Sequence, residues 1–165
     1  MTKVRVTGLD KAQKDLKAKI VDSIKRSNFN ERLEKDVRAK VRKDGIGPAL
    51  EESTKRFRNR VVSKKGPGYF VGKSSLTLSG QLLSSLRSYF NDKKLNFGFF
   101  VKTGTHKPYR VQGKKKTYKT GGGSRLKDIF EGLSKMRPVT KVFEDSEFKR
   151  ATERKLVAAI KRFFK

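Results

Sequence analysis

The sequence predicts an α+β fold, with amino-terminal helices packed on a small antiparallel β-sheet and an amphipathic helix at the carboxyl end. Three observations lead to this prediction. Apolar residues recur at three- and four-residue spacing over residues 9–61 and again over residues 146–165, which is the periodicity of one helix face. Between these stretches, aromatic and apolar residues alternate over residues 88–104, as in a half-buried strand. Glycine and proline are concentrated at the junctions.

A chain of 165 residues with 34% hydrophobic content is expected to form a single domain, residues 1–165. We expect residues 1–63 to form a helical half and residues 64–143 a β-rich half. The β-rich half contains a basic loop, residues 106–127. Residues 144–165 are expected to form the closing helix, with an apolar face made of Phe148, Thr152, Leu156, Ala159, Ile160 and Phe163.

The helical half divides into a short strand and three helices. Residues 3–8 alternate and end in glycine, which predicts a strand before the first helix. That helix carries a stripe of Leu9, Ala12, Leu16, Ile20 and Ile24. Asn28 is predicted to cap a second helix in a capping box with Glu31, ahead of a stripe of Phe29, Leu33, Val37 and Val41. Pro48 is predicted in the first turn of a third helix, which carries Leu50, Phe57 and Val61.

In the β-rich half, residues 64–75 have the glycine and proline content of a loop. Residues 88–104 predict a β-hairpin with the four-residue connection Asn-Asp-Lys-Lys, and with Phe97, Phe99 and Val101 in the core. Residues 106–125 contain four glycines and no acid. This segment is either a strand pair with a mobile tip or a loop that only a partner orders, and the places of Tyr109 and Tyr118 stay open.

The positive charge is concentrated in the middle of the chain. The 43 Lys and Arg against 16 Asp and Glu give a net charge of +27. Residues 1–52 hold 14 bases and 9 acids and residues 128–165 hold 10 and 6, so residues 53–127 hold the remaining 19 bases and one acid, Asp92. An excess of +18 in one span indicates a polyanionic partner, because uncompensated like charges repel. The alternative is an ordinary solvated surface, which normally mixes both signs.

Composition also bears on the function classes. No apolar run approaches the roughly 18 residues of a membrane span, and the amino terminus has no apolar signal core, so we expect a soluble and unprocessed protein. With no cysteine and one histidine, no disulfide and no structural zinc site is expected. We expect no cofactor.

The sequence gives little support for an enzyme active site. A nucleotide-binding phosphate loop needs four residues between its first glycine and the Gly-Lys pair, whereas Gly66 leaves five and Gly68 leaves three. A metal-dependent nuclease needs clustered carboxylates, and the basic span offers Asp92 alone, with Glu52 as the nearest acid before it. His106 has the setting of a loop residue rather than of a general base. We therefore expect that the protein is not an enzyme, with a nuclease as the weakest alternative.

Four short motifs follow one another in a recognisable order. They are V-T-G-L-D-K at residues 6–11, L-S-G-Q-L-L-S-S-L at 78–86, V-K-T-G-T at 101–105 and R-P-V at 137–139. This order resembles the tail-completion and neck proteins of tailed bacteriophages, the minor tail or virion-morphogenesis proteins of the head–tail junction. The residues that match the family's elements are Ser79, Gly80, Leu82, Ser85, Leu86, Thr103, Gly104, Thr105, Arg137, Pro138 and Val139.

The second of these motifs also has a local physical interpretation. Gly80 permits a tight backbone turn into a short helix, and Ser79 is placed to cap that helix. Three leucines then fix the turn to the core: Leu82, Leu83 and Leu86.

The resemblance implies a structural protein of the virion that completes the tail or joins head and tail as a ring around the DNA path. It implies a homo-oligomeric ring, expected to be a hexamer, that contacts neighbouring neck and tail proteins. The expected location is the virion, and the host cytoplasm during assembly. From the charge distribution we expect the basic loop to meet genomic DNA or an acidic neighbour. The expected contact residues are Lys107, Arg110, Lys114, Lys115, Lys116, Lys119, Arg125 and Lys127. The alternative function is a free, nonspecific nucleic-acid-binding protein.

Overall fold

The computed structural model describes residues 8–45, 50–63, 66–67, 81–120, 122–136 and 138–164. Several predicted features lie outside these residues: the strand before the first helix, Pro48, most of the loop at residues 64–75, the pair Ser79 and Gly80, and Arg137.

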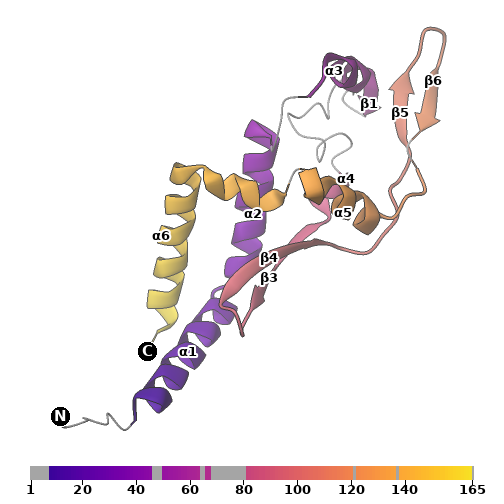
Figure 1. The fold of residues 1–165 in the computed structure, drawn as a ribbon. Coiled ribbons are helices and arrows are strands. Elements are labelled where there is room, and N and C mark those ends of the chain that lie inside the picture. Colours follow the sequence, from indigo (N-terminus) through magenta and orange to yellow (C-terminus); the bar gives the residue numbers. More distant parts are fainter. Residues whose placement is uncertain are drawn as a thin grey trace.

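The chain forms the predicted α+β fold (Figure 1). Its helices are α1 (Leu9–Arg26), α2 (Phe29–Asp44), α3 (Glu52–Asn59), α4 (Gln81–Ser84), α5 (Leu126–Met136), the 3-10 helix η2 (Val139–Glu144) and α6 (Ser146–Phe163). Its strands are β1 (Val61–Ser63), β2 (Gly66–Pro67), β3 (Leu86–Asn91), β4 (Asn96–Val101), β5 (Tyr109–Gln112) and β6 (Thr117–Thr120). They form two antiparallel sheets, β2-β1-β5-β6 and β3-β4.

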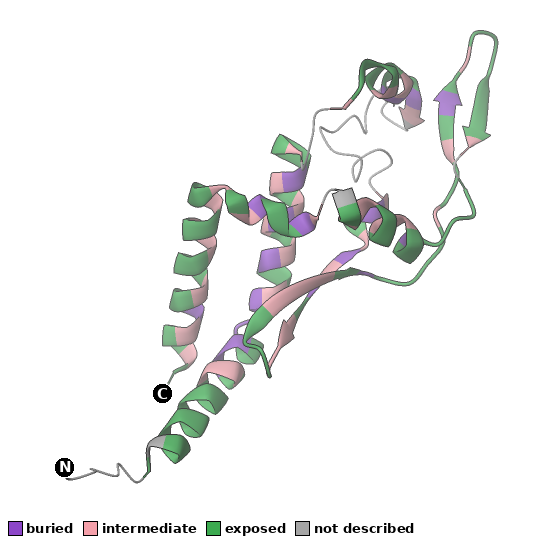
Figure 2. Ribbon diagram, in the orientation of Figure 1, coloured by how far each residue is buried: buried purple, intermediate pink, exposed green. Residues whose placement is uncertain are grey.

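The hydrophobic core lies between α2 and the β3–β4 hairpin, and α4, α5, η2 and α6 close it (Figures 1 and 2). The predicted stripe of α2 is buried along its length. The three leucines of the central motif are buried as predicted, with at most 5% of each exposed. The predicted face of α6 also turns inward, with Ala159 buried and the other five residues half-buried.

A polar network fastens α2 to β3 beside this core. The carboxylate of Glu34 pairs with the Arg38 guanidinium at 3.0 Å and accepts a hydrogen bond from the Ser88 backbone N–H at 2.8 Å. Arg38 in turn donates to the carbonyl of Leu86. The side chain of Glu34 is only 13% exposed, so its charge depends on these partners. The network satisfies backbone groups on the edge of β3 that faces α2.

The β3–β4 hairpin confirms the prediction for residues 88–104, with its connection one residue later than expected. Residues 92–95 form the turn, and the side-chain oxygen of Asn91 accepts hydrogen bonds from the backbone N–H groups of Lys93 and Lys94 at 3.0 and 3.1 Å. This Asx turn needs Asn at the strand end, which explains the shift. Phe97 and Phe99 are half-buried against the core and Val101 is buried.

Three predictions for the helical half are wrong. Leu50 is not part of the third helix, because α3 begins at Glu52. Asn28 does not cap α2 with its side chain, because its backbone has φ 51° and ψ 31° and a capping residue needs an extended backbone. The left-handed residue instead makes the sharp corner between α1 and α2. Val61 does not continue the third helix; it lies in β1, paired with Val111. That pairing also joins the expected helical half to the β-rich half, which itself contains α4, α5 and most of η2.

The predicted stripe of α1 is buried only at its carboxyl end. Ile24 is 5% exposed and Ile20 is half-buried, but residues 8–19 are exposed wherever their burial is described, including Leu16 at 51%. Figure 1 shows why: the amino-terminal part of α1 extends past the end of α6. Across the described residues, no helix combines the length and apolar character that crossing a membrane requires.

Candidate nucleic-acid interface

The β5–β6 hairpin projects from the body of the molecule beside β1 and α3 (Figure 1). Residues 113–116 form its turn, in which the Gly113 N–H donates to the carbonyl of Lys116 at 3.0 Å. At the end of β5 next to this turn, the Gln112 N–H donates to the Arg60 carbonyl at 2.7 Å, and Arg110 and Val111 of β5 pair with β1. Of the two forms that the sequence left open for this segment, the strand pair is the one observed.

The two faces of the hairpin differ because side chains alternate along each strand. One face carries Tyr109 and Val111 on β5, opposite Thr120 and Tyr118 on β6. Val111 is fully buried on this side. The ring of Tyr109 meets Phe57 of α3 edge-on, with a centroid distance of 6.3 Å, and burial raises the pKa of the Tyr109 hydroxyl. This face therefore fastens the hairpin to the body.

The opposite face of the hairpin is basic. Arg110 lies directly across the strand pair from Lys119, and Gln112 lies across from Thr117. Like charges in directly opposed positions destabilise a sheet, since their Cβ atoms are only about 4.5–5.5 Å apart. All four side chains are exposed, so an anion in solution can reach them.

The turn between β5 and β6 adds three more cations at the end of the basic face. Lys114, Lys115 and Lys116 are all exposed. Within the described part of the chain, neither these lysines nor Arg110 and Lys119 form an ion pair. We call these five residues the basic hairpin set: Arg110, Lys114, Lys115, Lys116 and Lys119.

The other three predicted contact residues lie at or below the hairpin base. Lys107 precedes β5, and its backbone N–H and C=O both bond the side chain of Gln81, at 2.7 and 2.9 Å. Arg125, just before α5, pairs with Asp128 at 2.8 Å, and Lys127 on α5 pairs with Glu131 at 3.7 Å. Local acids therefore compensate Arg125 and Lys127, and the structure brings together five of the eight predicted residues as uncompensated charge.

Arg60 is a basic residue beside the hairpin that the sequence analysis missed. It was placed in the helical half, but its carbonyl binds Gln112 and its exposed side chain lies 5.9 Å from the centroid of Phe57. No local pattern signals this position, because it depends on β1 pairing with a strand almost 50 residues later.

The candidate nuclease residues are not gathered at one site. Asp92 lies in the β3–β4 turn and pairs with Lys25 of α1 at 2.6 Å, whereas Glu52 lies on α3 and pairs with Lys55 at 2.7 Å. His106 lies half-buried against Tyr109, with ring centroids 5.7 Å apart. Its backbone also holds the loop together, since its N–H donates to the Ser124 carbonyl at 2.7 Å. This is a structural setting for the histidine.

Comparisons of the chain with protein-family models, with curated proteins and with solved structures gave no match. The functional argument therefore rests on the chemistry of the hairpin and on the motif order in the sequence.

Proposed function

We propose that this chain is a non-catalytic structural protein of the neck or tail end of a tailed bacteriophage, and that its β5–β6 hairpin contacts the phosphates of DNA. The order of the four sequence motifs supports the phage assignment. The observation that carries the polyanion contact is the uncompensated basic hairpin set, with Arg110 and Lys119 directly opposed on one exposed face.

The composition of that face favours DNA over an acidic protein as the partner. Protein interfaces depend on buried aromatic or aliphatic anchors. On this face of β5 and β6, the residues beside Arg110 and Lys119 are Gln112 and Thr117, which are polar. Lysine ammonium groups bind phosphates as point charges without reading the bases. A contact of this kind suits a protein that must let any sequence pass.

A ring of identical subunits would repeat this hairpin around the DNA path. The positive charge of each copy would repel its neighbours there, and phosphates passing through the ring would compensate it. Five contacts to duplex DNA would give a salt dependence of log K on log [salt] with a slope of about −4.5.

The test is a quadruple variant of a phage that encodes this chain, with Lys114, Lys115, Lys116 and Lys119 all changed to Gln. We expect heads and tails to accumulate unjoined in electron micrographs. The matched control changes four exposed lysines of the helices instead: Lys35, Lys43, Lys135 and Lys161. Normal yields of joined particles from the hairpin variant would show that the hairpin has no role in assembly.

A free nucleic-acid-binding protein is the second candidate, and Tyr118 favours it. Tyr118 is 43% exposed on the hairpin face that lies opposite the face of Arg110 and Lys119, and exposed aromatic residues close to cations stack on unpaired bases. This function predicts tight binding of single-stranded DNA or RNA by the isolated protein. The neck function predicts instead that the protein remains with purified particles through a high-salt wash, because protein contacts hold it there.

A further inference from the structure

The amino-terminal part of α1 presents an apolar residue, Leu16, that the described part of the chain leaves half exposed. Leu16 is 51% exposed, although the same stripe continues into half-buried Ile20 and buried Ile24. A single exposed leucine is ordinary on a protein surface. Here, however, it continues a face that is buried one to two turns further along the helix, and Figure 1 shows the amino-terminal end of α1 extending past the end of α6. One turn further on, the Lys19 ammonium lies 5.8 Å from the centroid of the Phe164 ring of its own chain.

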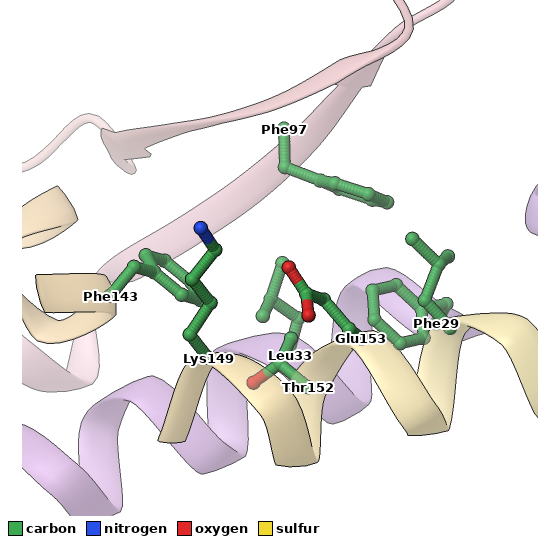
Figure 3. A pocket seen from close by; sticks show the side chains of 8 residues that line it. Phe29, Leu33, Phe97, Phe143, Lys149, Thr152 and Glu153 are labelled. Atoms are coloured by element: carbon green, nitrogen blue, oxygen red, sulfur yellow. The ribbon is translucent and has the colours of Figure 1, made fainter. Parts of the chain in front are cut away.

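An apolar pocket lies elsewhere on the same chain, between α2, β4, η2 and α6. Its volume is about 210 Å³. Figure 3 shows the aromatic rings of Phe29, Phe97 and Phe143 around it, with Leu33 at its floor. Lys149 and Glu153 of α6 lie at its rim, one helical turn apart. The pocket has space for a branched aliphatic side chain, and its lining is of matching chemistry.

We propose that α1 of one copy docks on this pocket of a second copy, with Leu16 inserted among the three aromatic rings. The two surfaces are different parts of one chain, so the contact is head-to-tail and each copy can both give and receive a helix. Such contacts repeat, and they close into a ring where the rotation between copies allows it. This inference depends on the proposed function only in its last step, the closure of the copies into a ring.

The charges around the two surfaces are complementary. Asp15 and Lys19 lie one turn apart beside Leu16 on α1, and Lys149 and Glu153 repeat that spacing with opposite signs at the pocket rim. Asp15 and Lys149 have no ion-pair partner among the described residues of their own chain. If the two helices run in the same direction, Asp15 faces Lys149 and Lys19 faces Glu153. Both pairs can form together because each helix spaces its two charges four residues apart.

The helix that docks carries little net charge of its own. Residues 9–22 hold four lysines and three aspartates, a net charge of +1, whereas residues 53–127 hold +18. The contact therefore joins copies through a nearly neutral helix, and the basic hairpin is not part of it. Repulsion at the hairpins is the part that DNA compensates in the proposed function.

The first experiment measures self-association of the full chain after nuclease treatment, by sedimentation equilibrium. We expect oligomers for the wild type and more than about tenfold weaker association for Leu16→Asp, since truncating or charging a central anchor removes most of a contact's affinity. Val157→Asp is the matched control, because Val157 is 49% exposed on the outer side of α6 and does not line the pocket. It should associate as the wild type does. A monomeric wild type at about 100 µM, or equal effects of the two variants, would overturn the proposal.

The second experiment uses the head-to-tail geometry. Thr152→Phe places a ring in the pocket, so that this variant keeps its α1 but cannot receive one. Alone, Thr152→Phe and Leu16→Asp should each be monomeric, and thermal unfolding should show both to be folded. Mixed, they should form a heterodimer, because the intact α1 of one fits the intact pocket of the other. Absence of the heterodimer would contradict the assignment of these two surfaces.

The charge pair gives a third test. Asp15→Lys should weaken association by several-fold, and adding Lys149→Glu in the same chain should restore most of it. The hairpin variant with four Gln substitutions should associate as the wild type does. Failure of DNA contact and failure of self-association are thus observed separately.

Discussion

Replacing Lys119 with Glu is expected to stabilise the fold while it weakens DNA binding. Lys119 lies opposite Arg110 on the exposed face of the hairpin, so the substitution turns a repulsive pair into an attractive one at the same position. A substitution on the buried face could not separate the two effects, because it would also disturb the packing of the hairpin on α3.

The magnitude follows from the register. Two unit charges at the cross-strand Cβ spacing of about 5 Å would interact in water by about 0.8 kcal/mol, and salt at 0.1 M reduces this to about 0.5 kcal/mol. This is an upper bound, because the charges of Arg110 and Lys119 lie at the ends of long exposed side chains. Removing the repulsion and adding an attraction of equal size gives about 1 kcal/mol, which agrees with the upper range for cross-strand pairs. For a chain of this size the melting temperature should rise by about 2–4 °C.

Binding should change in the opposite direction. The substitution would remove one phosphate contact, and the new carboxylate would hold the Arg110 guanidinium away from a second, so the magnitude of the salt slope should fall by about 1 to 2. Fluorescence anisotropy with a labelled duplex across a salt series measures this slope, and thermal unfolding measures the stability. Lys161→Glu on α6 makes the same change in net charge far from the hairpin and is the control. A Lys119→Glu variant that melts lower, or binds DNA with an unchanged slope, would refute the reasoning.

Three further predictions follow from individual contacts. Glu34→Gln should lower the free energy of unfolding by about 2 kcal/mol in urea titrations, because it leaves half-buried Arg38 without its charge partner, whereas Glu31→Gln at an exposed position of α2 should change it by less than about 0.5 kcal/mol. The hydrogen bond from Lys40 lowers the pKa of Asp145, so the ionised carboxylate stabilises the fold above the ordinary Asp pKa of about 3.9 and this contribution is lost as the pH falls through the lowered value. Asp145→Asn should therefore melt lower than the wild type at pH 7, and the difference should shrink toward zero in acid; a constant difference would contradict the ion-pair explanation. Tyr118→Ala should leave duplex affinity within about threefold if the hairpin contacts phosphates only, and a loss of more than about tenfold on single strands would favour base stacking.

Much of the candidate site followed from local sequence. The acid-free segment identified the hairpin as the most basic part of the chain, and all eight predicted contact residues are exposed. The sequence analysis missed the compensation of Arg125 and Lys127, although their acids lie only three and four residues later, because it treated residues 106–127 as a loop and predicted no helix at α5. It also could not place Arg110 opposite Lys119, because the register depends on the turn at residues 113–116.

The fold shows the same division. Periodicity alone determined the α+β class, the buried faces of α2 and α6, and the β3–β4 hairpin, because each of these depends on residues close together in the chain. Tertiary structure decided the rest: the pairing of β1 with β5, the left-handed corner at Asn28, and the exposure of half of the α1 stripe. The first and third of these depend on segments distant in sequence, which supply or withhold the contact that the local pattern needs. An apolar stripe indicates which face of a helix is to be buried. Only the packed molecule shows how much of that face the described part of its own chain buries.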